Sequence, residues 1–330
     1  VLMRVCHWTM MNKSGMHRVA ESCVEAEKKL GVDSVLANPM DEATWIYDAD
    51  INVSHTHLPD KVQTKHPWPF FEPKKKEKPY VWVSHGTPDH VFQSSVEQGT
   101  HYGAADGWML AQNWLRTAHA CVTFWPRHHA IWQSMCDRGR KVDLVPLGVD
   151  KEFWQKVPTK GKYAGAPSIL TCENAHYIKW PFDLMLIWDW ILEEFESAKL
   201  HSLYLPNDTH RWFFPLVNRN GCSYGSYITS SVFDHDGLRN AYVSTDYYIG
   251  LVQKGDFNRI SLEANASGAR TISYKGNPYS WYHIQEGDQR EIAKELRAIL
   301  RGEVEPRKDR LEVPDISETA KAMIEIYNRL

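Results

Sequence analysis

The sequence lacks three features that would each assign it to a distinct class of protein. No apolar run approaches the roughly 18–20 residues of a membrane span. The start of the chain has no long apolar region of the signal-peptide kind and reads as a first strand. No C-x-x-C pair occurs among the cysteines, which argues against a zinc site or a disulfide framework. We therefore expect a cytoplasmic protein with reduced thiols at Cys6, Cys23, Cys121, Cys136, Cys172 and Cys222.

An excess of either charge is also absent. The 38 Lys and Arg residues and 41 Asp and Glu residues give a net charge of −3, which is no overall electrostatic footprint for nucleic acid. The G-x-S-x-G, P-loop and G-x-G-x-x-G motifs do not occur. Tryptophan, tyrosine and histidine are abundant, at 14, 15 and 16 residues. Most should pack in cores or interfaces, and the rest could line a groove that stacks on sugars or bases.

Short β-rich runs alternate with helical stretches along the whole chain. In the first half we expect a helix over 16–30 and strands at 3–8, 34–37, 51–55, 80–84, 120–124 and 142–145. In the second half we expect strands at 168–172, 201–205, 227–233, 247–252 and 271–274, with helices at 181–197, 237–244, 261–267 and 289–301. Glycine and proline crowd between Leu147 and Gly165, which marks a boundary. Two consecutive α/β sets predict two Rossmann-like domains with parallel sheets facing a cleft.

The stretch from Phe257 to Ser273 is the most informative part of the sequence. Ser261 to Ser267 reads as a helix that Gly268 closes, and a strand follows at once. Glu263 then lies near a helix start at a strand–helix edge, where α/β proteins bind ligands. The free N–H groups of a helix start favour a phosphate, and the carboxylate can accept hydrogen bonds from a sugar diol.

This stretch resembles the nucleotide-sugar signature of retaining glycosyltransferases with the GT-B fold. In that signature an acidic residue, seven further residues and a Glu precede Ala-x-Ala-x-Gly. Glu263 matches the second acid; the first falls on Gly255, with Asp256 adjacent. The run Val142–Phe153 resembles the strand and turn that end the family's first domain, with Leu147 where Asn is common. Its implied role is interdomain geometry.

Further matches follow the family's order along the chain. Lys179 matches the lysine that neutralises the donor diphosphate, whereas the family's Arg falls near Glu173 or Asn174, so Arg259 or Arg127 would supply that charge. His85 matches the strand-end histidine that contacts the donor sugar, and Gly15 the glycine turn near the phosphates. His55 and His57 are weaker candidates for an acceptor edge. The implied catalytic residues are His85, Lys179 and Glu263, and the implied donor-binding residues are Gly15, Lys179, Asp256, Phe257, Asn258, Arg259 and Glu263.

The resemblance implies a GT-B glycosyltransferase that moves a sugar from a nucleotide-diphospho-sugar, with UDP expected, to an acceptor hydroxyl with retention of configuration. Residues 1–155 would bind the acceptor, 156–314 the donor, and 315–330 would form a helix that crosses back to the first domain. The leaving phosphate would take the acceptor's proton, so neither a protein base nor a separate cofactor is expected. Asp48-Ala-Asp50 is a D-x-D triplet, but it precedes a strand in a GT-B-like chain, and we assign no metal.

The acceptor and the activity leave alternatives open. A saccharide, lipid or small-molecule hydroxyl is one acceptor; hydroxymethylated DNA, as in compact virus-type enzymes, is another. The insertion 61–78 combines six lysines with Trp68, Phe70 and Phe71, which suits phosphates and bases. A non-catalytic nucleotide-sugar-binding relic would explain Gly255, and a sugar-nucleotide epimerase would act on the donor alone. The sequence does not indicate an oligomeric state.

Overall fold

The computed structural model describes residues 2–9, 15–39, 41–46, 48–55, 78–86, 115–136, 139–156, 163–172, 182–203, 227–230, 235–252 and 259–330. The chain forms two compact units. Unit 1 comprises Val1–Asp150 and Pro314–Leu330, and unit 2 comprises Lys151–Val313. The chain therefore leaves unit 1 after Asp150 and returns at Pro314, whereas the sequence placed these divisions at 155 and 314.

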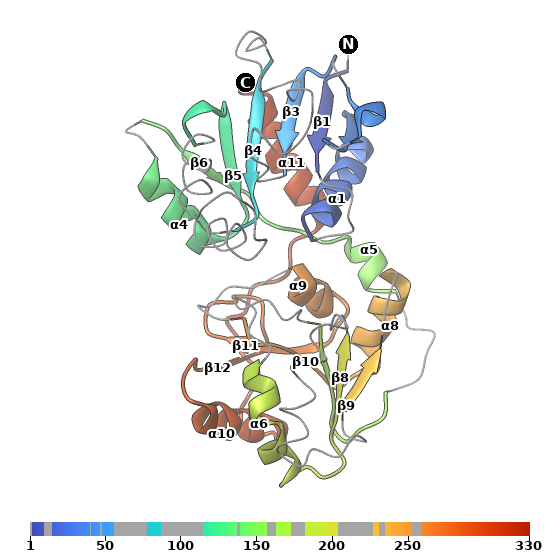
Figure 1. Cartoon of the computed structure of the whole chain (residues 1–330), viewed down its shortest axis with the longest axis vertical. Coiled ribbons are helices and arrows are strands. Elements are labelled where there is room, and N and C mark those ends of the chain that lie inside the picture. Colours follow the sequence, from blue (N-terminus) through green and yellow to red (C-terminus); the bar gives the residue numbers. More distant parts are fainter. Residues whose placement is uncertain are drawn as a thin grey trace. The chain divides into compact units, whose positions relative to one another are not determined.

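Unit 1 is built on a six-stranded parallel sheet in the order β2-β1-β3-β4-β5-β6 (Figure 1). Valine and other apolar residues dominate these strands, as expected where a parallel sheet is covered on its faces. β3 and β4, for example, are buried along almost their whole length. The strands are β1 (Arg4–Trp8), β2 (Asp33–Ala37), β3 (Ile51–Ser54), β4 (Tyr80–Ser84), β5 (Ala120–Thr123) and β6 (Val142–Leu144).

Two helices far apart in the sequence pack together in unit 1. α1 (Gly15–Lys29) connects β1 to β2, and α11 (Ile316–Tyr327) lies against it. α11 starts at a capping box, in which the Asp315 carboxylate caps the first turn and the Glu318 side chain reaches back to the Asp315 N–H. Ala26 of α1 packs with Ile316 and Ala320 of α11. The terminal helix thus belongs to the first unit, as the GT-B resemblance implied.

The sequence reading missed a helix in unit 1. α4 (Pro126–Met135) begins with proline at a first-turn position, where the missing N–H costs nothing. Only His128 and Trp132 of its side chains are buried, so its periodicity is weak and the stretch lacked a helical signal. The short 3-10 helix Glu42–Thr44 was missed for its length.

The segment that follows β6 is hydrogen-bonded to the segment through which the chain returns to unit 1. The Val149 N–H donates to the Pro314 carbonyl (3.1 Å), and the Ile316 N–H donates to the Val149 carbonyl (3.0 Å). The Thr319 hydroxyl donates to the Pro146 carbonyl at 2.7 Å and accepts from the Gly148 N–H at 2.8 Å. A Cβ on Gly148 would lie 2.3 Å from the Asp315 carbonyl oxygen. Only glycine allows this approach of backbone to backbone.

Unit 2 contains a second six-stranded parallel sheet, in the order β12-β11-β10-β7-β8-β9. The strand β12 was not predicted, because a three-residue strand gives no periodic signal. The strands of this sheet are β7 (Ser168–Thr171), β8 (Lys199–Leu203), β9 (Tyr227–Ser230), β10 (Tyr247–Gly250), β11 (Arg270–Tyr274) and β12 (Tyr282–Ile284).

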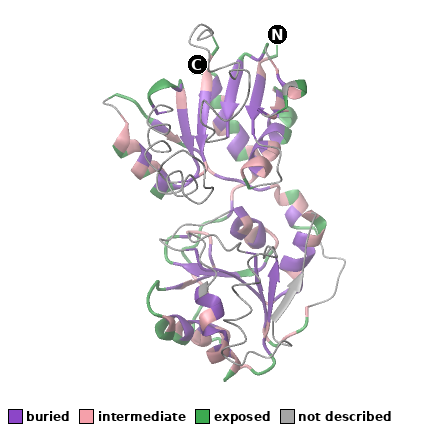
Figure 2. Ribbon diagram, viewed as in Figure 1, coloured by how far each residue is buried: buried purple, intermediate pink, exposed green. Residues whose placement is uncertain are grey.

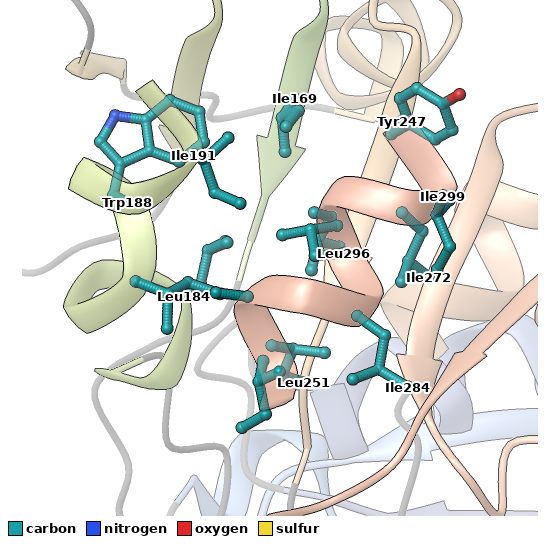
Figure 3. Packing of buried hydrophobic residues seen from close by; sticks show 14 of the residues in the cluster. Ile169, Leu184, Trp188, Ile191, Tyr247, Leu251, Ile272, Ile284, Leu296 and Ile299 are labelled. Atoms are coloured by element: carbon teal, nitrogen blue, oxygen red, sulfur yellow. The ribbon is translucent and has the colours of Figure 1, made fainter. Parts of the chain in front are cut away.

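Apolar faces of two helices fill the core of unit 2 (Figure 3). Leu184, Trp188 and Ile191 of α6 (Phe182–Leu192) meet Leu296 and Ile299 of α10 (Gln289–Leu300) over the sheet. α6 ends at Leu192, five residues before the predicted 197, and β8 begins at Lys199, two residues before the predicted 201. The other helices in the described part of unit 2 are α5 (Lys151–Trp154), α8 (His235–Ser244) and α9 (Arg259–Ala266).

In each unit the strands are the most buried elements, and the exposed residues gather on helices and connections (Figure 2). Among the described residues, no helix is both long and apolar enough to span a membrane.

Replacing Gly148 with alanine should destabilise the protein by about 1–3 kcal/mol, because the added methyl group collides with backbone that has little room to move. The matched control is Gly287→Ala, where a Cβ meets nothing within 4 Å and the change should stay within about 0.5 kcal/mol. Denaturant unfolding of both variants measures the difference. Equal unfolding free energies of the two variants would contradict the close packing of Gly148 against Asp315.

Candidate functional site

Both sheets have a point where the strand order reverses, and ligands of open α/β sheets bind outside the carboxyl ends of the strands at such points. In unit 1 the chain goes from β1 to β2 on one side and then to β3 on the other, so the reversal lies between β1 and β3. In unit 2 it lies between β7 and β10, and the order corresponds to the 3-2-1-4-5-6 arrangement of dinucleotide-binding folds.

Three histidines form a hydrogen-bonded row across the reversal point of unit 1. His7 lies in β1, His55 directly follows β3 and His85 directly follows β4. His7 Nδ1 is 2.9 Å from His55 Nε2, and His55 Nδ1 is 3.0 Å from His85 Nε2. The rings of each pair have centroids 5.2 Å apart. The row therefore joins three neighbouring strands at their carboxyl ends.

The row ends on a buried carboxylate. His7 Nε2 is 2.9 Å from Glu27 Oε2, and Glu27 lies on the buried face of α1. The Ser34 hydroxyl donates to the same oxygen, and the Tyr327 hydroxyl donates to Oε1 at 2.9 Å. His7, Glu27 and His55 are fully inaccessible to solvent. A charge buried so deeply needs several partners, and here α1, β1, β2 and α11 each provide one of the groups.

Burial shifts the proton affinities of two members of this cluster. It lowers the pKa of His55 well below the ordinary imidazole value, and the neighbouring His7 and His85 lower it further. It raises the pKa of the Tyr327 phenol well above its usual value, with the Glu27 charge as the next cause. His55 is therefore neutral at physiological pH, and Tyr327 is a hydrogen-bond donor.

His85, predicted from its place after an apolar strand, is the half-buried end of the row. Its ring packs against His55 and, at a centroid distance of 5.5 Å, against Phe124. The following turn is fixed, because the Gly86 carbonyl accepts from the Ser84 hydroxyl at 2.8 Å and from the Trp132 indole at 2.9 Å.

Sequence reasoning missed His7 and Glu27 and gave His55 a lesser role. The available signal was a carboxylate on an otherwise apolar helix face, since Glu27 shares the buried side of α1 with Val19, Cys23 and Val24. Such a residue needs a buried partner. Gly15 is the first residue of α1, where a Cβ would meet nothing within 4 Å. The described part of unit 1 therefore does not require glycine there.

In unit 2, α9 is the helix that follows β10 at the reversal point. It begins at Arg259, two residues earlier than the sequence suggested, so Glu263 lies in the second turn instead of near the start. The Arg259 guanidinium donates to Glu263 Oε1 at 2.8 Å, and the two side chains are 8% and 1% exposed. Arg259, proposed as a donor-binding cation, thus already holds the proposed ribose-binding carboxylate.

The order of the two charges along α9 is the less favourable one. An Arg four residues before a Glu is the weaker orientation of such a pair on a helix. Negative charge beside the Arg259 guanidinium stabilises it, and Glu263 supplies one such charge. A phosphate at the helix start would supply another.

Contacts with the β11–β12 region hold α9 in place. The Asn277 amide donates to the Ser261 hydroxyl at 3.3 Å, and the Thr271 hydroxyl donates to the Asn265 side-chain carbonyl at 2.9 Å. Gly268, with φ of +87°, closes the helix as predicted. The side chains of α9 are therefore fixed relative to the sheet of unit 2.

Several predicted donor-site residues lie outside the described residues. They are Lys179, Asp256, Phe257 and Asn258, together with Glu173, Asn174 and Gly255, where the signature departs from the family. His57 and nearly all of the lysine-rich insertion lie outside them too. Arg127 is an exposed residue of the first turn of α4 in unit 1.

The D-x-D triplet has a structural partner. The Asp48 carboxylate accepts from the Arg4 guanidinium at 2.7 Å, and the Asp50 carboxylate accepts from the Arg4 N–H at 2.8 Å. Arg4 starts β1, so the triplet lies at the amino edge of the sheet, opposite the histidine row. Within the part of the chain that the structure describes, no group of three or more His, Cys, Asp or Glu side chains could hold a metal ion.

Comparison with known proteins finds no matching family model and no matching curated protein. Solved structures match along the whole chain. HepE from Anabaena, in complex with UDP and glucose, is 10% identical, covers 99% of this chain and 100% of its own, and has a TM-score of 0.66. Sucrose-phosphate synthase from Thermosynechococcus elongatus is 13% identical, with coverage of 99% and 98% and a TM-score of 0.72. AviGT4, a glycosyltransferase involved in Avilamycin A biosynthesis, is 12% identical, with coverage of 99% and 97% and a TM-score of 0.61.

At these identities the likeness concerns the fold. The chain has the GT-B fold of two Rossmann-like units with a C-terminal helix in the first, which confirms the predicted fold class.

The lowered pKa of His55 predicts a pH dependence of stability. The unfolded chain binds this proton at an ordinary pKa of about 6.5, whereas the native state does not. Stability from this group is full above that pH and is lost as the pH falls below it, by up to about 1.4 kcal/mol per pH unit. His55→Gln, which can still bridge two hydrogen bonds, should show a correspondingly shallower loss.

Calorimetric unfolding of the whole chain between pH 7.5 and 5 measures both slopes. His17→Gln, in α1 but outside the row, is the control for the loss of one histidine. Equal slopes in wild type and His55→Gln would mean that the native state protonates His55.

Proposed function

We propose that this protein is a glycosyltransferase that transfers a sugar from a nucleotide-diphospho-sugar to an acceptor hydroxyl. The observation that carries the proposal is the position of α9. It follows β10 at the reversal point of a dinucleotide-type sheet, and it carries a buried Arg259–Glu263 pair at its start. Solved proteins of the same fold that contain UDP and glucose support the same assignment.

In this proposal unit 2 binds the donor. The N–H groups at the start of α9 and the Arg259 guanidinium face the negative charge of the diphosphate, which offsets the less favourable charge order of the helix. Glu263 accepts hydrogen bonds from the ribose hydroxyls while Arg259 holds its other oxygen. Lys179 neutralises the diphosphate, and Asp256, Phe257 and Asn258 complete the donor site, as the sequence resemblance implies.

Unit 1 supplies His85 toward the sugar and binds the acceptor. We propose retention of configuration, with the leaving phosphate accepting the acceptor's proton, and UDP as the nucleotide. Catalysis then consists of positioning and of stabilising the departing diphosphate. The nucleotide sugar is a substrate, and no separate cofactor is proposed. A saccharide or small-molecule hydroxyl is the proposed acceptor, and hydroxymethylated DNA is the alternative that the lysine-rich insertion suggests.

A second candidate is binding of a nucleotide sugar without transfer. Gly255 stands where the signature has its first acid, and the remaining acid, Glu263, is 1% exposed and paired with Arg259. This candidate predicts donor affinity without turnover.

Release of UDP from UDP-sugars, with and without acceptors, tests the proposal. Acceptors should include oligosaccharides, small alcohols and hydroxymethylated duplex DNA, the last across a salt series because phosphate contacts weaken as salt rises. We expect acceptor-dependent release with a saccharide or small alcohol, and a loss of about 10²-fold or more in kcat/KM for Lys179→Ala. Lys294→Ala, a surface lysine beside Glu291, is the control.

Donor binding without release under any condition would favour the second candidate, and a change in the donor sugar without an acceptor would indicate an epimerase. The absence of donor binding would contradict both.

Glu263→Gln should weaken UDP binding by roughly 1.5–3 kcal/mol, since the amide keeps the shape but loses the charge-assisted hydrogen bonds. The change also removes one charge of a buried pair and so destabilises the fold. Calorimetric titration well below the variant's melting temperature separates the two effects. Glu291→Gln, an exposed glutamate in α10, should leave affinity unchanged. Unaltered affinity in Glu263→Gln would remove this residue from the donor site.

A further inference from the structure

The histidine row in unit 1 contains two groups that the sequence analysis did not name, Glu27 and His7, and a third, His55, to which it gave only a minor role. Glu27, His7 and His55 are completely buried, yet they form one continuous line of hydrogen bonds that reaches the half-buried His85. Three imidazoles in series on a carboxylate are costly to bury, because every ring nitrogen must find a partner of the right kind. If the row served stability alone, well-packed apolar side chains of similar volume would stabilise the fold at least as well.

The charge of Glu27 sets the direction of every hydrogen bond in the row. Tyr327 and Ser34 already donate to its two oxygens, and a third contact comes from His7 Nε2. Three contacts of this kind suit an ionised carboxylate, which only accepts, so His7 Nε2 carries a hydrogen. A neutral imidazole has one donor and one acceptor. His7 Nδ1 then accepts from His55 Nε2, and His55 Nδ1 accepts from His85 Nε2.

We propose that Glu27, His7 and His55 form a positioning and proton relay that holds His85 in its Nε2–H tautomer. In this tautomer Nδ1 is the nitrogen of His85 that accepts a hydrogen bond or a proton. The proposal rests on the proposed function, in which His85 contacts the donor sugar. Glu27, His7 and His55 are positioning residues, because they act through His85.

The row can also take up one proton with all atoms accounted for. A proton that binds His85 Nδ1 is balanced by transfer of the Nε2 proton to His55 Nδ1. His55 in turn passes its Nε2 proton to His7 Nδ1. The positive charge ends on His7, beside the ionised Glu27, and the middle ring returns to neutrality. Burial and the two flanking rings lower the pKa of His55, so the charge does not rest there.

The C-terminal helix takes part in this arrangement. Tyr327 donates to Glu27 Oε1 at 2.9 Å, and burial keeps the phenol protonated by raising its pKa. Among the described residues, the groups that face the row include Glu27 of α1, Ser34 of β2, Tyr327 of α11 and Phe124, which contacts His85, and the Cys23 thiol of α1 lies near the Tyr327 phenol.

Ring-nitrogen NMR of the ¹⁵N-labelled full chain without ligand tests the relay directly. Substitution of each histidine in turn by Gln assigns the signals. We expect His7, His55 and His85 all as Nε2–H tautomers in the wild type. In Glu27→Gln the new amide can donate to His7 Nε2, which reverses the row, and His85 should become the Nδ1–H tautomer. With a nucleotide sugar, kcat of this variant should fall about tenfold or more, since a wrong imidazole tautomer can cost up to about 10⁴-fold.

Glu25→Gln, at an exposed glutamate of the same helix α1, is the matched control. It makes the same chemical change outside the row, so the tautomers and kcat should stay near wild type. A purely structural role of Glu27 would instead let Glu27→Gln lower stability without changing any tautomer.

An Nδ1–H tautomer of His85 in the wild type, or unchanged tautomers in Glu27→Gln, would overturn the relay. The wild-type spectrum, once assigned with the histidine variants, judges the relay without Glu27→Gln, so the test does not depend on the folding of that variant. If the wild type turns over no nucleotide sugar, the proposed function fails, while the ligand-free spectrum still judges the relay.

Discussion

A single buried carboxylate organises unit 1. Glu27 is removed from solvent within an apolar helix face, and an isolated charge in that position would cost several kcal/mol. Its partners come from β1, β2 and α11, through His7, Ser34 and Tyr327. The C-terminal helix must therefore return to the first unit to complete this site. The Gly148 contact with Asp315 brings the chain back at the position that allows it.

In both parallel sheets, the charged groups that fasten the strands lie at the amino edge, and the candidate functional groups lie at the carboxyl edge or follow it. At the amino edges, ion pairs and caps fasten the sheets: Arg4 binds Asp48 and Asp50 in unit 1, and Asp246 binds the N–H and hydroxyl of Ser168 in unit 2. The carboxyl edges carry the histidine row in one unit and are followed by α9 in the other. A D-x-D triplet therefore does not indicate a metal site unless it is known at which edge of the sheet the triplet lies.

Much of the fold follows from the sequence, because alternation and glycine boundaries are strong signals in long α/β chains. The bounds of β4 agree with the expectation residue for residue, and His85 lies where the strand predicted it. Helix α4 and strand β12 were not predicted, because α4 has a weak apolar face and β12 has only three residues. Glu27 and His7 were not predicted for a different reason: a lone charged residue in a helix is ordinarily solvated, and only tertiary packing brings three other elements around Glu27. The Arg259–Glu263 bond likewise was not predicted, because the expected helix began only at Ser261 and left Arg259 outside it.

The central claim is that α9 of unit 2 forms the donor site. A crystal structure of the full chain with UDP tests it most directly. The account predicts diphosphate oxygens at the N–H groups that begin α9, close to Arg259, and ribose hydroxyls on the Glu263 carboxylate. UDP bound elsewhere on unit 2, with the Arg259–Glu263 pair untouched, would contradict it.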